Sequence, residues 1–123
     1  MGEPVRLGLD ALVDVLRAAG EPTRLRLLAL LAAGDVTVTD LTEILGQSQP
    51  RISRHLKLLG EADLIDRYQE GAWAYFRLRQ EGKAASFVRN LLAHASDNDP
   101  VILRDGERLD AVKRQRSERA QAY

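Results

Sequence analysis

The chain has 123 residues, 45% of them hydrophobic and 29% charged, which is the composition of one soluble domain with its own core. It contains no cysteine, so disulfides, thiolate metal ligands and thiol redox switches are excluded. No run approaches the roughly 20 apolar residues that span a bilayer, and the N-terminus lacks a basic segment followed by an apolar run. We therefore expect a cytoplasmic protein without a membrane partner.

The charges balance overall but are unevenly distributed. Residues 1–50 contain four Arg or Lys and seven Asp or Glu, whereas residues 51–123 contain fourteen and eleven. With a formal net charge of zero, any affinity for nucleic acid must come from local clustering. The basic excess begins at residue 51.

Two helices are predicted in the first third of the chain. Apolar residues recur at helical spacing from Leu9 to Ala19 and stop at Gly20, over an arc broad enough for two burying neighbours. A second, leucine-rich helix begins near Pro22, a residue suited to a first turn, and runs to Gly34. We expect this second helix to be the centre of the core.

A helix-turn-helix is predicted next. The short extended piece 36–38 leads to a third helix, for which Thr39 is the expected N-cap, and Gly46 ends that helix. Only Gln47 separates Gly46 from Ser48, the expected N-cap of a fourth helix. This spacing is typical of a helix-turn-helix.

The fourth helix, Ser48 to Leu59, has one apolar and one polar side. Its buried stripe is expected to consist of Ile52, Leu56 and Leu59. No acidic residue occurs from Ile44 to Gly60. The pattern therefore predicts a helix that packs on one side and presents polar and basic side chains on the other.

The polar side of this helix is a candidate reader of the DNA major groove. Arg54 can engage guanine O6 and N7, and Gln49 can pair with adenine, with Ser53 beside them. Contacts to backbone phosphate are expected from Ser48, Arg51 and Lys57. The alternative interpretation is an ordinary helix with a solvated polar face. His55, beside the apolar stripe, is expected to pack or to form a hydrogen bond.

A β-hairpin is predicted after the fourth helix. Segments 64–69 and 73–78 alternate apolar and polar residues around the turn 70–72. Arg67 and Gln69 are expected to reach a phosphate or an adjacent minor groove, the alternative being an exposed hairpin of mixed charge. The aromatic residues of the second strand are expected to pack in the core rather than stack on bases: Trp73, Tyr75 and Phe76.

A fifth amphipathic helix is predicted over 84–96, followed by a turn at 97–100 and a charge-dense stretch over 105–123. That last stretch can be helical but has little to bury. The expected fold is mainly α with a small β-hairpin, a winged helix-turn-helix with an extra C-terminal helical tail. We expect a DNA-binding and dimerisation domain over 1–96 and a charged linker or helix over 97–123.

Three motifs carry a family resemblance. Segments 21–28, 48–59 and 71–78, in this order and spacing, resemble the ArsR/SmtB family of bacterial dimeric repressors, a match covering roughly 8–95. The resemblance implies a homodimer paired through its first and fifth helices that binds a double-stranded DNA operator and releases it when an effector binds. It implies a transcriptional regulator, not an enzyme.

The sequence departs from the metal-sensing members of that family. Thr37 and Thr39 stand where their Cys-Val-Cys-type motif has thiolates, and residues 83–96 offer only His94 toward a fifth-helix zinc site. We therefore expect no metal site and no cofactor. The expected effector is a small organic molecule, another protein, or the product state of an attached domain.

The tail carries a second resemblance. Segments 99–104, 107–112 and 116–123 look like the linker of fused proteins in which an ArsR-type regulator precedes an S-adenosylmethionine-dependent methyltransferase domain. The alternative function is therefore the N-terminal regulatory part of such a protein. No strand followed by a glycine-rich, cofactor-binding loop occurs, so this chain alone should lack methyltransferase activity.

Overall fold

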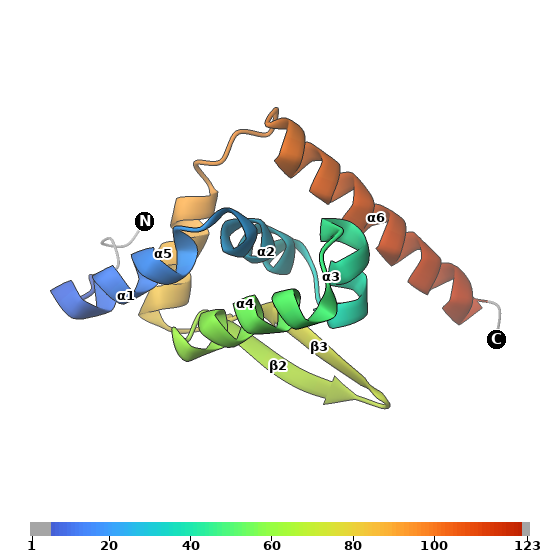
Figure 1. Ribbon diagram of the computed structural model, residues 1–123, viewed down its shortest axis with the longest axis horizontal. Helices are drawn as coiled ribbons and strands as arrows, with labels where there is room; N and C mark the ends of the chain where they lie inside the picture. The colour runs from blue at the N-terminus through green and yellow to red at the C-terminus, as the bar shows by residue number, and fades with distance from the viewer. Residues whose placement is uncertain (1–5, 122–123) are drawn as a thin grey trace.

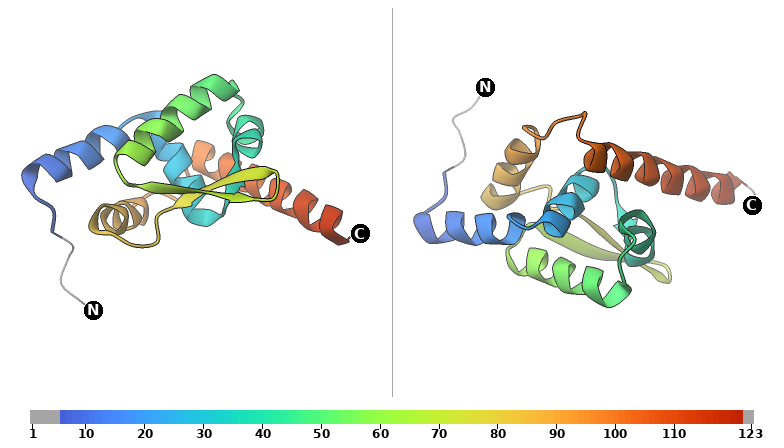
Figure 2. Two further views of the ribbon diagram at one scale, coloured as in Figure 1. Left: turned by 90° about the horizontal axis from the view of Figure 1, so that it is seen from below. Right: turned by 45° about the horizontal axis from the view of Figure 1, so that its top comes forward.

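The computed structural model describes residues 6–121, which form six helices and a three-stranded sheet (Figure 1). In chain order the helices are α1 (Leu9–Ala19), α2 (Pro22–Ala33), α3 (Val38–Leu45), α4 (Gln49–Glu61), α5 (Lys83–Leu92) and α6 (Pro100–Gln121). The strands are β1 (Val36–Thr37), β2 (Ile65–Glu70) and β3 (Trp73–Leu78). Helices α1 and α5 lie at one end of the molecule, and the tip of the β2–β3 hairpin and the end of α6 lie at the other (Figures 1 and 2). Within residues 6–121, no helix is both long and apolar enough to cross a membrane.

The central position of α2 is confirmed. This helix packs against α1, α4, α6 and β3. Glu21 caps it by accepting a hydrogen bond from the backbone N–H of Arg24 at 2.9 Å, and Pro22 occupies the first turn. Its buried leucines are Leu27, Leu28, Leu30 and Leu31. The winged-helix core is assembled around this one helix.

The cap of α3 differs from the expectation. Thr37, not Thr39, is the N-cap: its hydroxyl accepts from the N–H of Asp40 at 3.1 Å, and the Asp40 carboxylate accepts from the N–H of Thr37 at 3.0 Å. The placement of the cap at Thr39 was therefore wrong. The reason is the acidic residue three positions after Thr37, which completes a reciprocal capping box that Thr39 has no partner to form.

The expected hairpin is confirmed, and it belongs to a larger sheet. The strand order is β1-β3-β2, all antiparallel, with Val36 opposite Phe76 and Ile65 opposite Leu78. Gly71, with φ +61°, lies in the tip of the hairpin. The extended piece before α3 is therefore a third strand, which fixes the hairpin to the body of the protein.

Of the three aromatic residues expected to pack in the core, Phe76 does so, Tyr75 is half-buried outside the core cluster, and Trp73 is exposed. Trp73 is 57% exposed because it is the first residue after the hairpin tip, beyond the reach of the helices. Phe76 packs against the core, and Tyr75 is half-buried and stacks on Tyr68 with ring centroids 5.5 Å apart. Side chains enter the core only toward the base of the hairpin.

The C-terminal region is more ordered than its composition suggested. Helix α5 ends at Leu92, earlier than expected, and α6 runs for 22 residues across α2 and α3. Leu109 and Val112 are buried in the core, and Asp105 is only 3% exposed. The expectation that this stretch has little to bury was wrong, because a few well-spaced residues are inserted between α2 and α3. The division of the chain into 1–96 and 97–123 stays a prediction.

Candidate DNA-binding surface

The turn between α3 and α4 is short and capped on both sides. Gly46 ends α3 in the left-handed conformation, with φ +67°, which glycine adopts at little cost. Ser48 then caps α4, its hydroxyl accepting from the N–H of Arg51 at 3.4 Å. The expected caps of this turn are confirmed, and the turn fixes the direction in which α4 leaves α3.

Helix α4 has the two sides that the sequence predicted. Its buried residues are Ile52, Leu56 and Leu59. Its exposed residues include every candidate contact named for this segment, which are Ser48 at the cap and Gln49, Arg51, Ser53, Arg54 and Lys57 on the helix. The fold therefore leaves this polar and basic face open to solvent. We define these six residues as the α4 face.

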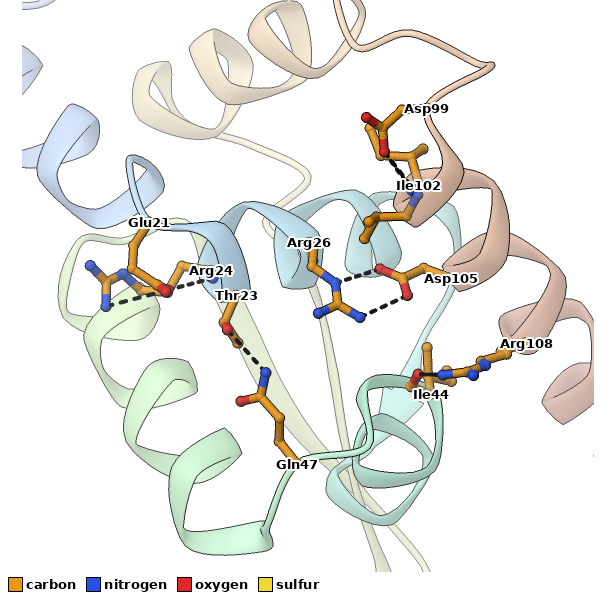
Figure 3. A network of polar contacts seen from close by, with 11 residues as sticks. Glu21, Thr23, Arg24, Arg26, Ile44, Gln47, Asp99, Ile102, Asp105 and Arg108 are labelled. Carbon is orange, nitrogen blue, oxygen red and sulfur yellow. Dashed lines mark hydrogen bonds and ion pairs between the residues drawn. The ribbon is translucent and has the colours of Figure 1, made fainter.

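The turn between α3 and α4 is hydrogen-bonded to the start of α2. Gln47 Nε2 donates to the hydroxyl of Thr23 at 3.1 Å, and Thr23 is itself buried (Figure 3). Gln47 occupies the turn between Gly46 and Ser48. The position of the turn is thus set by a side chain from the central core helix.

A second polar cluster joins the middle of α4 to the start of α2. His55 Nδ1 lies 3.3 Å from Arg24 Nη1 and 3.7 Å from Glu21 Oε2. Burial disfavours the charged form of Glu21, but backbone N–H groups and the adjacent charges of Arg24 and His55 outweigh it, and its pKa falls below its ordinary value. His55 is therefore a hydrogen-bonding residue as expected, and it links α4 to the N-terminal end of α2.

The hairpin presents two of the candidate residues on one strand. Arg67 and Gln69 are exposed on β2, with Tyr68 pointing to the other side of the sheet. The Tyr68 hydroxyl donates to Asp35 Oδ2 at 2.5 Å, and this hydrogen bond raises the pKa of Tyr68. Gln69 Nε2 donates to the carbonyl of Gly71 at 3.2 Å. Tyr68 thus anchors the hairpin to the residue that precedes β1.

The α4 face and the hairpin belong to neighbouring elements. Strand β2 packs on α4, and the hairpin tip lies toward the end of the molecule at which α4 begins (Figures 1 and 2). Trp73 adds an exposed aromatic ring near the tip, although its side chain is of the kind that usually packs in a core. Its position immediately after the turn was the signal that it would be exposed.

The threonines at the position of the missing thiolates have other partners. Thr37 caps α3, and the carbonyl of Thr39 accepts from the Thr42 hydroxyl at 2.7 Å. Among residues 6–121, no three His, Cys, Asp or Glu side chains are grouped so that they could hold a metal ion.

Comparison with known proteins agrees with this architecture. The family description "Bacterial regulatory protein, arsR family" matches residues 21–67, which include α2, the helix-turn-helix and the start of the hairpin. The transcriptional repressor SdpR of Bacillus subtilis is 38% identical over 65 residues, covering 53% of this chain and 72% of that protein. The arsenic resistance transcriptional regulator ArsR2 of Pseudomonas putida is 43% identical over 81 residues, covering 64% of this chain and 68% of that protein.

A solved structure shares the fold. The homodimeric winged helix-turn-helix DNA-binding domain of Mb0332 from Mycobacterium bovis, described as a possible ArsR-family transcriptional regulator, superimposes with a TM-score of 0.60. It is 27% identical and covers 69% of this chain and 77% of that chain. The chain thus combines the family's sequence motifs with a winged helix-turn-helix, and it belongs to the ArsR family of bacterial transcriptional regulators.

Proposed function

We propose that this protein is a homodimeric repressor that binds an inverted-repeat DNA operator through the α4 face of each subunit. The observation that carries the proposal is the α4 face itself. Six polar or basic side chains stay exposed on one side of a helix whose opposite side is buried. Hydrogen bonds between His55 and Arg24 and between Gln47 and Thr23 hold this helix and the turn before it against α2. Such a surface costs nothing to keep in water and suits a groove lined by base edges and phosphates.

The side chains divide into two roles. Arg54, Gln49 and Ser53 read base edges, because guanidinium and amide groups match the hydrogen-bonding patterns of guanine and adenine in the major groove. Contacts to backbone phosphate, which give affinity and salt dependence, come from Ser48, Arg51, Lys57, Arg67 and Gln69.

The dimer forms through α1 and α5. Leu9 of α1 is 77% exposed, and a second copy would cover this side chain. The relative from Mycobacterium bovis is homodimeric, which supports a dimer but does not identify the helices that pair. Two-fold symmetry then places one α4 face in each half-site, about 34–36 Å apart along the operator.

Release of the operator follows the binding of a non-metal effector. Thr37 and Thr39 carry hydroxyls at the positions where the metal-sensing members of the ArsR/SmtB family carry thiolates, and this supports a non-metal effector. The effector must bind more tightly to a dimer whose α4 faces no longer match the operator. The alternative, a regulatory part of a fused methyltransferase, stays a prediction that reading the gene beyond Tyr123 would test.

Operator binding by single variants tests the proposal. Duplexes selected from a random pool by the wild-type protein provide the ligand, and fluorescence anisotropy gives the affinity over a series of salt concentrations. Arg54→Ala should lose about 1–3 kcal/mol and relax the sequence preference at one base pair of each half-site. Lys57→Ala should weaken binding to all sequences and reduce the salt slope by about one.

Arg104→Ala is the matched control. This arginine is also exposed, but it lies on α6, on the opposite side of α2 from α4 (Figure 1). It should bind the selected duplex as the wild type does. If Arg54→Ala binds with wild-type affinity and preference at moderate salt, the α4 face does not read DNA.

A further inference from the structure

A large apolar cavity lies between α1, α2, α5 and the first half of α6, on the other side of α2 from the α4 face. Its volume is about 720 Å³, which falls within the roughly 300–1,000 Å³ of small-molecule sites. The walls are aliphatic and include Leu16, Leu30, Leu91, Ile102 and Leu109. This is the size and lining of a ligand pocket.

The charged groups at the cavity are engaged by partners within the protein: Asp99 accepts hydrogen bonds from the backbone N–H groups of Val101 and Ile102, and the other two pair with each other. Arg26 of α2 and Asp105 of α6 form a two-pronged pair, with Nε–Oδ2 at 2.8 Å and Nη2–Oδ1 at 2.9 Å (Figure 3). The hydrogen bonds to Asp105 raise the pKa of Arg26 above its ordinary value. A ligand with a full charge would meet no unpaired opposite charge in this pair, so an uncharged molecule is complementary to the cavity.

Gly106 leaves open space on the α6 wall of the cavity. It lies inside α6 and lines the cavity, although glycine weakens a helix interior relative to alanine. A Cβ added at Gly106 would meet no atom within 4 Å, and Gly106 does not have the positive φ that would favour glycine. A larger side chain at Gly106 would therefore extend into the space of the cavity without displacing a protein atom.

Helix α6 connects this cavity to the helix-turn-helix. Between the cavity-lining residues Gly106 and Leu109, Arg108 Nη1 donates to the carbonyl of Ile44 at 2.8 Å, two residues before the Gly46 turn (Figure 3). Nearer the end of α6, Arg116 pairs with Asp40 in the first turn of α3. One rigid helix therefore contacts the cavity and both ends of α3.

We propose that this cavity binds a small, uncharged, mainly aliphatic molecule, and that α6 couples its occupancy to the orientation of α3 and α4. The described lining side chains include no Phe, Tyr or Trp and only one ring that could stack, the imidazole of His94, which favours an aliphatic chain over a planar ring. The site itself does not depend on the proposed repressor function, but its effect on DNA binding does. Ligand binding and operator binding are therefore measured separately.

The first experiment titrates the full chain with 1-octanol, followed by calorimetry and by the methyl NMR signals of Ile102 and Leu109. Saturable binding with shifts at these two residues is expected. Octanoate, the charged analogue of equal length, should bind at least about tenfold more weakly. Equal affinity for the two compounds, or no binding of octanol, would overturn the proposal.

Two variants fill the cavity from opposite walls. Gly106→Leu adds a side chain from α6 and Ala29→Leu extends one from α2, and each should lower octanol affinity at least about tenfold. Gly60→Leu is the control, because Gly60 also has open space but lies in α4 away from the cavity. Wild-type octanol affinity in both filled variants refutes the site. The site is also refuted if light scattering shows that the two filled variants no longer form dimers, because a second copy of the chain would then be the occupant of the cavity.

The second experiment measures the affinity for the selected duplex with and without octanol. Octanol should weaken operator binding by the wild type and leave operator binding by Gly106→Leu unchanged. If octanol binds but does not alter operator affinity, the coupling through α6 is wrong and the site stands. If the wild type binds no duplex at all, the repressor function fails while the octanol result still decides the site.

Discussion

The Arg26–Asp105 pair should contribute strongly to the docking of α6. Asp105 is 3% exposed and accepts two charge-assisted hydrogen bonds, at 2.8 and 2.9 Å, from a guanidinium that is 79 residues away in the chain. Removing one partner of a fully buried pair costs about 3–5 kcal/mol. The side chain of Arg26 keeps 19% of its exposure, so water can partly replace the lost carboxylate. For Asp105→Ala we therefore expect a loss of about 2–4 kcal/mol.

The free energy of unfolding is measured by urea denaturation followed by circular dichroism, at one protein concentration because dimerisation makes stability concentration-dependent. The double variant Arg26→Met/Asp105→Leu should recover most of the loss, since replacing both charges by apolar groups of similar size is often neutral or stabilising. Asp110→Ala, at an exposed position of the same helix, is the control. A loss below about 0.5 kcal/mol for Asp105→Ala, the range of ordinary surface substitutions, would refute the docking role.

Two further substitutions test local contacts of the fold. Thr37→Ala should cost about 1 kcal/mol by removing the capping box with Asp40, and Thr39→Ala should be nearly neutral; the reverse order in urea denaturation would restore Thr39 as the cap. The folded-state pKa of Tyr68 lies above its ordinary value of 10.0, because ionisation would break its hydrogen bond to Asp35. The contribution of this hydrogen bond to stability is therefore complete below about pH 10 and is lost as the pH rises through the folded-state pKa. Tyr68→Phe should lack that alkaline loss of stability and one phenolate absorbance step; a variant whose stability falls with pH as that of the wild type does would contradict this assignment.

The elements of the winged helix could be predicted from the sequence because their signals are local. The spacing of leucines in α2, the glycine at 46 and the serine at 48 act within one or two helical turns, so the helix-turn-helix follows from neighbouring residues alone. The exposed side of α4 followed for the same reason. A helix of 3.6 residues per turn with a buried stripe must present its remaining side chains to solvent.

Capping and exposure at single residues were harder to predict, because two local signals competed. Thr37 and Thr39 are both acceptable caps, and only the reciprocal hydrogen bonds with Asp40 select the first. Trp73 has the side chain of a core residue, but its place next to the hairpin tip keeps it beyond the helices.

The sequence by itself determined the helices, the turn and the hairpin, and through them the family and the candidate DNA-binding face. Only the tertiary structure decided that the charged C-terminal stretch is a docked helix with a cavity behind it. The contacts that hold α6 join residues 64 to 81 positions apart, among them Arg108 with Ile44 and Arg116 with Asp35. Pairs at that separation leave no periodic pattern in the chain, because the partners are chosen by the packing of α2 and α3 and not by their neighbours in sequence.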